Sequence, residues 1–385
     1  MKYRNFGELE RRVSALGFGV MRLPIIGEDR GNIDETESIK MIRYAIDHGL
    51  NYIDTAYPYH SGKSEILVGN ALKDGYREKV RLATKMPIRL LESEEDLDRI
   101  FSEQLQKLQT DYVDFYLLHG LRKATWSKVL EFNVLKWAEK EITNRRIGYL
   151  GFSFHDEYKM FKEIIDGYDG WTFCQIQYNY VDTEYQAGTR GLKYAASKGL
   201  AVVVMEPIQG GNLSVNPSEE IQAIWDEAEI QRSPAEWALQ WVWNQPEVSL
   251  ALSGMSTMDH VVENVRSANR SDSDILTDEE LILISRVREK YLESGFIGCT
   301  GCRYCIPCPE SVVIPEILTF YNEYYTKRGN TNAQQDIIKK YLDMILPETR
   351  AEICAKCGEC EDKCPQQLPI RKLLVRAAWS FKTKE

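Results

Sequence analysis

The chain has 385 residues, a formal net charge of −10, and 43% hydrophobic and 28% charged residues. This length accommodates one large domain and a small one, and the acidic balance argues against nucleic acid or an anionic membrane as the main partner. No run approaches the ~18 apolar residues of a membrane span, and the N-terminal MKYRNFGELERRV lacks the apolar core of a signal peptide. We therefore expect a cytoplasmic protein, in which clustered cysteines suggest metal binding rather than disulfides.

The first 285 residues alternate between short apolar runs and amphipathic stretches. A hairpin is expected first, because residues 2–6 and 11–14 flank a turn-like Gly7-Glu8. The strands expected after it are residues 15–19, 51–54, 80–84, 112–118, 147–151, 173–176, 201–205 and 248–252. The helices expected between them include residues 37–48, 94–108, 128–140, 184–197 and 234–244.

Eight strands separated by helices predict a (β/α)8 TIM barrel, whose parallel strands are buried on both faces. A doubly wound open sheet is the alternative, but no glycine-rich dinucleotide fingerprint follows an early strand. Residues 276–292 are expected to form a helix that leads into a cysteine-rich region. We place the domain boundary at Ser294-Gly295, with the barrel in residues 1–294 and a small α-helical domain in residues 295–385.

Eight of the nine cysteines stand in two runs of this C-terminal region. The first run is Cys299, Cys302, Cys305 and Cys308, and the second is Cys354, Cys357, Cys360 and Cys364. The second run matches the C-x2-C-x2-C-x3-C-P pattern of [4Fe–4S] ligands, in which the fourth cysteine of each run ligates the other cluster in two-cluster domains. The first run is similar, although two residues rather than three precede Cys308, which leaves open which cluster Cys308 serves.

The two runs resemble a bacterial-type ferredoxin that holds two [4Fe–4S] clusters. By that analogy one cluster is held by Cys299, Cys302, Cys305 and Cys364, and the other by Cys308, Cys354, Cys357 and Cys360. Zinc is the competing metal, but zinc patterns usually contribute two ligands from each of two separated C-x2-C pairs. An internal repeat aligns residues 308–318 with 364–374, and two helices, 315–326 and 332–345, are expected between the runs. Cys174, inside a strand pattern, is interpreted as a buried apolar filler.

Three polar residues each close an apolar strand of the predicted barrel: Asp54, Lys85 and His119. The carboxyl ends of barrel strands form the active face, and Tyr59 stands on the loop after the second strand. A phenol is a poor acid at neutral pH unless a cation stabilises its phenolate. Lys85 can supply that cation, Asp54 can hold the ammonium, and His119 can orient a substrate oxygen. Each residue alone has an ordinary structural explanation, but together they predict a proton-transfer set.

These residues stand in motifs that resemble the aldo-keto reductase family. Residues 49–59 (GLNYIDTAYPY), Thr84-Lys85 and residues 114–119 (DFYLLH) are similar to the motifs that carry its Asp/Tyr/Lys/His tetrad. The resemblance covers roughly residues 1–285, and the cysteine runs point to the iron–sulfur branch of the family. It implies that the protein reduces a carbonyl or oxidises an alcohol with NAD(P)H, with Tyr59 as the general acid/base.

The resemblance also implies cofactor positions. Ser153 and Gln175 match the residues that usually hold the nicotinamide carboxamide, and the loops after strands seven and eight match the phosphate-binding loops. The implied cofactor residues are Arg22, Ser153, Gln175, Met205, Pro207, Gly211, Gly254, Ser256, His260, Glu263 and Asn264. Arg22 could pair with a phosphate or a substrate acid, and a surface arginine is the alternative.

The chain departs from the family pattern at four of the cofactor contacts. Phe154 replaces an asparagine, and Met205 stands where an aromatic ring usually stacks on the nicotinamide. Gly254 replaces a frequent lysine, and His260 stands where an arginine commonly grips the 2′-phosphate of NADPH. The sequence therefore predicts a pocket that is not built for NADPH in the usual way.

A nicotinamide transfers two electrons at once as a hydride, whereas each cluster transfers one electron at a time. A flavin can take part in both one-electron and two-electron transfer. The preferred hypothesis is an NAD(P)H-dependent reductase whose clusters are structural or an ancillary electron path. The alternative places FMN in the barrel, fed through the clusters by a ferredoxin-like partner protein. A third hypothesis is a non-catalytic electron-transfer subunit, which the intact tetrad disfavours. The substrate is expected to be a small carbonyl or alcohol, with Tyr57, His60, His155 and Tyr180 as candidate lining residues.

Overall fold

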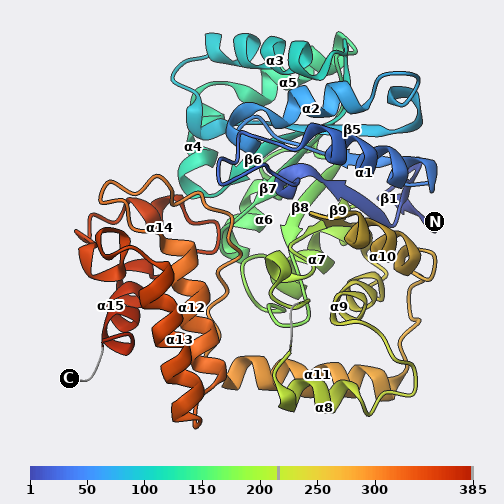
Figure 1. The fold of residues 1–385 in the computed structure, drawn as a ribbon. Coiled ribbons are helices and arrows are strands. Elements are labelled where there is room, and N and C mark those ends of the chain that lie inside the picture. The colour runs from blue at the N-terminus through green and yellow to red at the C-terminus, as the bar shows by residue number, and fades with distance from the viewer. Residues whose placement is uncertain (215–216, 383–385) are drawn as a thin grey trace. The chain divides into compact units, whose positions relative to one another are not determined.

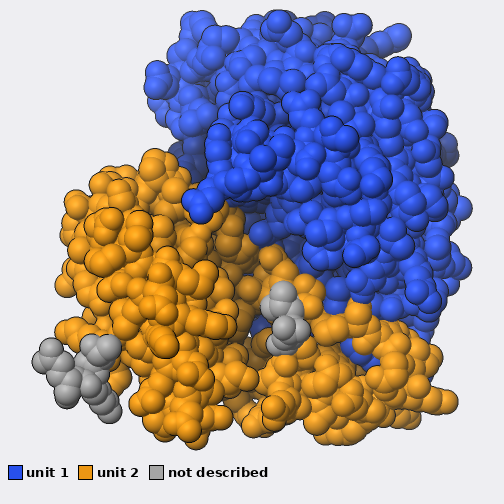
Figure 2. Space-filling model, viewed as in Figure 1, with its two compact units in different colours: residues 1–208, 235–277 blue, residues 209–234, 278–385 orange. Residues whose placement is uncertain are grey.

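A computed structural model describes residues 1–214 and 217–382 (Figure 1). The chain forms two compact units, residues 1–208 with 235–277 and residues 209–234 with 278–385 (Figure 2). Among the described residues, no helix combines the length and hydropathy that crossing a bilayer requires. The boundary at Ser294-Gly295 stays a prediction.

The first unit is built on a closed barrel of eight parallel strands in the order β10-β3-β4-β5-β6-β7-β8-β9 (Figure 1). Its strands are β3 (Leu16–Gly19), β4 (Tyr52–Asp54), β5 (Arg81–Met86), β6 (Val113–Leu121), β7 (Ile147–Phe154), β8 (Phe173–Gln177), β9 (Ala201–Met205) and β10 (Val248–Ser253). Nearly every strand residue is buried, because helices cover the outer face and side chains fill the interior. The predicted barrel is confirmed, and the open-sheet alternative is wrong.

A hairpin of β1 (Tyr3–Phe6) and β2 (Leu9–Ser14) closes one end of the barrel. The ring centroid of Phe6 lies 4.4 Å from that of Phe115 and 5.4 Å from that of Phe173, inside the apolar cluster of the barrel interior. Phe115 and Phe173 stand near the starts of β6 and β8, so the hairpin covers the end opposite the expected active face. The hairpin is therefore as predicted.

The helices of this unit are α1 (Glu35–Asp47), α2 (Ser64–Ala71), α3 (Glu95–Leu108), α4 (Lys123–Glu131), α5 (Val134–Thr143), α6 (Tyr158–Asp166), α7 (Gly188–Ser197), α9 (Pro234–Trp243) and α10 (Met258–Ala268). Two predictions were wrong. The helix expected over 128–140 is split into α4 and α5, because Asn133 adopts a left-handed conformation with φ 48°. The helix expected from residue 184 begins only at Gly188, since Gln186 also has a positive φ of 55°.

The second unit is helical. It contains α8 (Glu219–Trp225), α11 (Asp278–Glu293), α12 (Ile314–Thr326), α13 (Thr331–Met344), α14 (Glu359–Lys363) and α15 (Ile370–Ser380). The predicted helices before and between the cysteine runs are confirmed as α11, α12 and α13. Tyr341 and Phe381 stack with centroids 4.2 Å apart in the core that α12, α13 and α15 share. The cysteine runs themselves are mostly irregular backbone packed around this core.

Candidate active site and cysteine clusters

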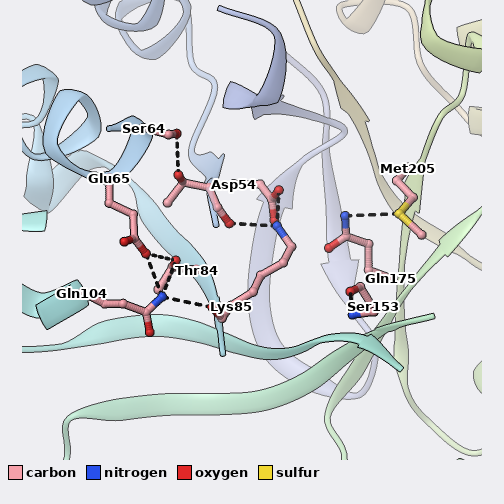
Figure 3. A network of polar contacts seen from close by, with 11 residues as sticks. Asp54, Ser64, Glu65, Thr84, Lys85, Gln104, Ser153, Gln175 and Met205 are labelled. Atoms are coloured by element: carbon pink, nitrogen blue, oxygen red, sulfur yellow. Dashed lines mark hydrogen bonds and ion pairs between the residues drawn. The ribbon is translucent and has the colours of Figure 1, made fainter. Parts of the chain in front are cut away.

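A buried ion pair joins two neighbouring barrel strands. The Lys85 Nζ donates hydrogen bonds to Oδ1 of Asp54 at 2.6 Å and to the carbonyl oxygen of Thr55 at 2.8 Å (Figure 3). Lys85 is 1% exposed and Asp54 2%. Burial raises the pKa of Asp54 and lowers that of Lys85, and the attraction between the two groups opposes both changes. The pair fixes the ammonium at one place on the barrel wall.

A second buried network holds the backbone of β5 at Lys85. Glu65 accepts hydrogen bonds from Thr84 Oγ1 at 2.6 Å and from Gln104 Nε2 at 2.7 Å (Figure 3). Gln104 also donates to the carbonyl oxygen of Lys85 at 3.0 Å, and its Oε1 accepts from the hydroxyl of Tyr116 at 2.6 Å. Burial raises the pKa of Glu65. Sequence reasoning missed Gln104, because a polar residue on an amphipathic helix carries no local sign that it points inward.

Tyr59 and His119 lie beside the ion pair. Tyr59 begins a short 3₁₀ helix (Tyr59–Gly62) and is 8% exposed. The centroid of its ring lies 5.1 Å from Lys85 Nζ and 6.0 Å from the centroid of His119, which it meets edge to face at 84°. Burial, and then the charge of Lys85, hold the pKa of His119 well below its ordinary value. The imidazole is therefore neutral at neutral pH and can donate one hydrogen bond. The structure brings together the four residues that the sequence singled out.

One detail of their placement was wrong. Lys85 and His119 were expected to follow the ends of their strands, but β5 continues to Met86 and β6 to Leu121. The strand can include Lys85 because Asp54 supplies a partner for the buried charge. Asp54 is the last residue of β4, as predicted.

Ser153 and Gln175 stand opposite each other in the register of β7 and β8. Ser153 Oγ accepts a hydrogen bond from the backbone N–H of Gly120 at 2.8 Å, and Gln175 Nε2 lies 3.7 Å from the sulfur of Met205 (Figure 3). Gln175 Oε1 is buried and has no hydrogen-bond partner in the described structure. A buried acceptor of this kind needs a donor, and the amide N–H of a nicotinamide carboxamide would fit it.

Arg22 packs across the loop after β10. It ends a short helix (Val20–Arg22) after β3, and its guanidinium lies 3.7 Å from Oε1 of Glu206. A Cβ on Gly254 would lie 2.9 Å from Cδ of Arg22, so the stem of Arg22 covers the space where a larger residue would stand. Sequence reasoning did not foresee the pairing with Glu206. The side chain of Arg22 is 21% exposed and paired, and its role toward a phosphate or a substrate acid stays a prediction.

The other residues expected to contact the cofactor lie just before α10 and in its first two turns. The N–H of Ser256 donates to Nδ1 of His260 at 3.4 Å, and Nδ2 of Asn264 donates to Ser253 Oγ at 2.9 Å. An imidazole that accepts at Nδ1 offers a single N–H, whereas an arginine offers a fork of donors. Glu263 is partly buried on the same helix. Position 260, which was expected to grip a 2′-phosphate, therefore supplies no guanidinium.

Two further residues predicted to bind the cofactor, Pro207 and Gly211, belong to different compact units. Pro207 is buried in the first unit, whereas Gly211 has a φ of 105° and belongs to the second. Cys174 is fully buried in β8, as interpreted.

Four residues, Tyr57, His60, His155 and Tyr180, were predicted to line the substrate pocket. Tyr57 donates its hydroxyl hydrogen bond to Glu103 at 2.9 Å, and Tyr180 is 1% exposed. Burial lowers the pKa of His60, and lowers that of His155 to about 4.

Each cysteine run lies against the fourth cysteine of the other. A pocket of about 380 Å³, its opening to solvent included, is lined by cysteines 354, 357 and 360 of the second run together with Cys308 of the first. Cys305 also touches this pocket. Burial raises the pKa of Cys360 to about 11, and the neighbouring thiols of Cys354 and Cys357 add to the effect. Ile314 and Leu374 give the pocket an apolar wall.

The other four cysteines form the complementary group. Burial raises the pKa of Cys305, and the adjacent thiols of Cys302, Cys299 and Cys364 raise it further. Sulfur ligands in a partly apolar setting suit an iron–sulfur cluster. Within residues 1–214 and 217–382, no three His, Cys, Asp or Glu side chains are arranged to hold a single metal ion.

Comparison with known proteins decides the family. Residues 15–282, more than half of the chain, match the aldo/keto reductase family. The chain belongs to that family. Residues 298–368 match a 4Fe-4S dicluster domain. The protein is therefore an oxidoreductase of the aldo-keto reductase type that carries a 4Fe-4S domain, as the sequence motifs predicted.

Its relatives span the barrel. L-galactose dehydrogenase of Arabidopsis thaliana is 27% identical over 75% of this chain and 95% of its own length. The NADH-specific methylglyoxal reductase of Escherichia coli is 26% identical over 71% of this chain and 95% of its own. The structure of an aldo-keto reductase from Klebsiella pneumoniae in complex with NADPH is 27% identical, with a TM-score of 0.59 over 74% of this chain and 95% of its own.

Proposed function

We propose that the barrel reduces a small aldehyde or ketone, or oxidises the corresponding alcohol, with Tyr59 as the general acid/base. The observation that carries the proposal is the buried Asp54–Lys85 pair beside the ring of Tyr59. The ammonium lowers the cost of forming the phenolate, so Tyr59 can give its proton to the carbonyl oxygen. Neutral His119 donates a hydrogen bond to the same oxygen and orients it.

NAD(P)H, when bound, supplies the hydride that adds to the carbonyl carbon while Tyr59 supplies the proton. The unpartnered Gln175 Oε1 and the neighbouring Ser153 support a carboxamide site at this end of the barrel. Arg22 provides a cation for the diphosphate. Because His260 replaces an arginine, we propose that NADH binds at least as well as NADPH. The E. coli relative is named as NADH-specific and the Klebsiella relative binds NADPH, so both cofactors occur among the relatives.

We further propose that the second unit holds two [4Fe–4S] clusters. The grouping of thiols supports one cluster on Cys299, Cys302, Cys305 and Cys364, and another on Cys308, Cys354, Cys357 and Cys360. Each group combines three cysteines of one run with the fourth of the other, as in two-cluster ferredoxins.

The function is tested with cluster-loaded protein purified without oxygen. Oxidation of NADH and NADPH is followed with a panel of aldehydes and ketones that includes methylglyoxal, and the reverse reaction with sugar alcohols and aldoses. Turnover of at least one substrate is expected. No turnover across the panel, in protein that binds neither nucleotide, would contradict the proposal.

A second candidate is a flavin-dependent enzyme that exchanges electrons with a redox protein through the clusters. Met205 favours it, because no aromatic ring stands there to stack on a nicotinamide. Heat-released supernatant of the loaded protein distinguishes the two functions. Flavin fluorescence in it would favour this candidate, and its absence favours the nicotinamide enzyme.

A further inference from the structure

The three residues directly after Tyr59 all adopt a left-handed backbone. Their φ angles are 51° at His60, 56° at Ser61 and 83° at Gly62. Glycine adopts this conformation freely, whereas in other residues the Cβ lies too close to the following carbonyl oxygen, so they adopt it singly rather than in runs. Backbone strain of this kind persists only where the surrounding structure imposes it, and it gathers at functional sites.

The side chain of His60 is buried in this turn, whereas that of Ser61 is exposed. His60 is 4% exposed, and its Nδ1 lies 2.8 Å from the carbonyl oxygen of Arg30. A carbonyl oxygen can only accept, so Nδ1 carries the hydrogen and donates it. Burial lowers the pKa of His60, so the imidazole is neutral at neutral pH. Within the described part of the chain Nε2 has no hydrogen-bond partner, so the ring is oriented through Nδ1.

The loop that supplies this acceptor is itself anchored to the barrel. Ile25 and Ile33 pair in an antiparallel bridge, which closes the loop around Arg30. The guanidinium of Arg30 donates a hydrogen bond to the carbonyl oxygen of Met21 at 3.1 Å. Met21 lies in the short helix that directly follows β3. His60 therefore ties the strained turn to a loop that is fixed beside a barrel strand.

We propose that His60 is a positioning residue that holds the ring of Tyr59 beside Lys85. The N–H of Tyr59 donates to the carbonyl oxygen of Ala56 at 3.1 Å, which fixes the residue on one side, and His60 fixes it on the other. The ring contacts Lys85 and His119, so a displacement alters both contacts. A misplacement of about 1 Å can lower a rate on the order of 10²-fold. The role rests on the proposed function, in which Tyr59 is the general acid/base.

His60→Ala removes the donor and keeps a Cβ in the turn. In cluster-loaded protein we expect hydride transfer in a single turnover to fall about 30-fold, with the affinity for NADH within about twofold of the wild type. The phenol of Tyr59 would lie farther from the ammonium of Lys85, so the phenolate would form only at higher pH. The midpoint of the pH profile for alcohol oxidation should therefore move upward by about one pH unit.

His60→Asn tests the hydrogen bond itself. The amide nitrogen of asparagine can take the place of Nδ1, and asparagine tolerates the left-handed conformation. Its rate should stay within about threefold of the wild type. Ser61→Ala is the matched control, because it keeps a Cβ in the same turn at an exposed position, and it should change neither the rate nor the pH profile. Equal losses in His60→Ala and His60→Asn would overturn the positioning role.

A second measurement needs no turnover. In protein labelled with carbon-13 at the tyrosine Cζ atoms, the magnetic resonance signal of Tyr59 is identified by its loss in Tyr59→Phe. We expect the signal to move in His60→Ala and to stay in place in Ser61→Ala. An unmoved signal in His60→Ala would overturn the positioning role and leave the proposed function standing.

A wild-type protein that turns over no carbonyl compound would overturn the proposed function, while the signal of Tyr59 still decides whether His60 positions the ring. If His60→Ala does not fold, His60→Gly replaces it with the same expectations, because glycine has no Cβ to strain the turn.

Discussion

Lys85 and Asp54 form a hydrogen-bonded ion pair of 2.6 Å whose two side chains are almost wholly buried. Burying two charges rarely adds net stability, because desolvation offsets their attraction. Removing one partner is costly, since the other charge is then left buried and unpaired. An arrangement that gains little stability and places a fixed cation 5.1 Å from a tyrosine ring supports the proposal that Tyr59 acts as the general acid/base.

Asp54→Asn should therefore impair both stability and turnover. We expect a loss of about 3 kcal/mol of unfolding free energy, the cost of a broken buried pair. Turnover should fall on the order of 10²-fold, because Lys85 loses the carboxylate that keeps it charged and in place. Thermal melting and steady-state kinetics check this. Asp74→Asn, which removes an exposed carboxylate paired with Arg43, serves as the control and should change neither quantity.

Arg22 should set the affinity for the diphosphate of the cofactor. Arg22→Ala is expected to weaken NADH binding on the order of tenfold and to flatten its dependence on salt, since a charged donor is lost. Glu206→Gln should strengthen binding by about threefold, because it removes the carboxylate that competes for the guanidinium. Fluorescence titration measures both.

Lys40→Ala, which removes an exposed cation of α1, should leave the affinity unchanged. If NADPH bound the wild type tenfold more tightly than NADH, the proposal drawn from His260 would be wrong.

His155 should make the protein less stable as the pH falls. Its folded pKa of about 4 lies below the ordinary 6.5, so the unfolded chain binds the extra proton first. The contribution of neutral His155 to the free energy of unfolding is fully present above pH 6.5. It is lost as the pH falls toward 4. At pH 5 the loss amounts to about 2 kcal/mol for this group.

Melting temperatures of wild type and His155→Gln at pH 7.5 and pH 5 test whether protonation of His155 lowers the stability. The variant should lose less stability on acidification than the wild type. An equal loss in both proteins would show that His155 does not titrate in this window.

If each cluster is held by three cysteines of one run and the fourth cysteine of the other, the substitutions that abolish the same cluster can be predicted. Fully loaded protein should contain about eight iron atoms, and loss of a cluster should leave about four. Cys364→Ser should lose the same paramagnetic signal as Cys302→Ser, and Cys308→Ser the same signal as Cys357→Ser. Cys174→Ser, outside both groups, should keep about eight iron atoms. If Cys364→Ser and Cys357→Ser abolished the same signal, each run would instead serve one cluster.

The sequence predicted the barrel and the tetrad because both depend on local pattern. Each buried strand is a short apolar run, and Asp54, Lys85 and His119 stand near the ends of such runs. The break at Asn133 was not predictable, because the residues on either side favour helix and only the left-handed conformation of one residue interrupts it.

Contacts between residues far apart in the chain could not be predicted from the sequence, for a different reason. Gln104 meets Glu65 across 39 positions, and Asn212 meets Cys299 across 87. Neither side chain differs in local pattern from an exposed polar residue. The pairing of Arg22 with Glu206 likewise depends on the closing of the barrel between β10 and β3.

Tyr59→Phe tests the central claim most directly. The variant is loaded with clusters and NAD(P)H without oxygen and mixed with the carbonyl compound that the wild type turns over fastest, and hydride transfer is followed in a single turnover. We predict a rate lower by about 10²- to 10⁴-fold, with nucleotide affinity and iron content unchanged. A wild-type rate in the variant would contradict the assignment of Tyr59 as the acid.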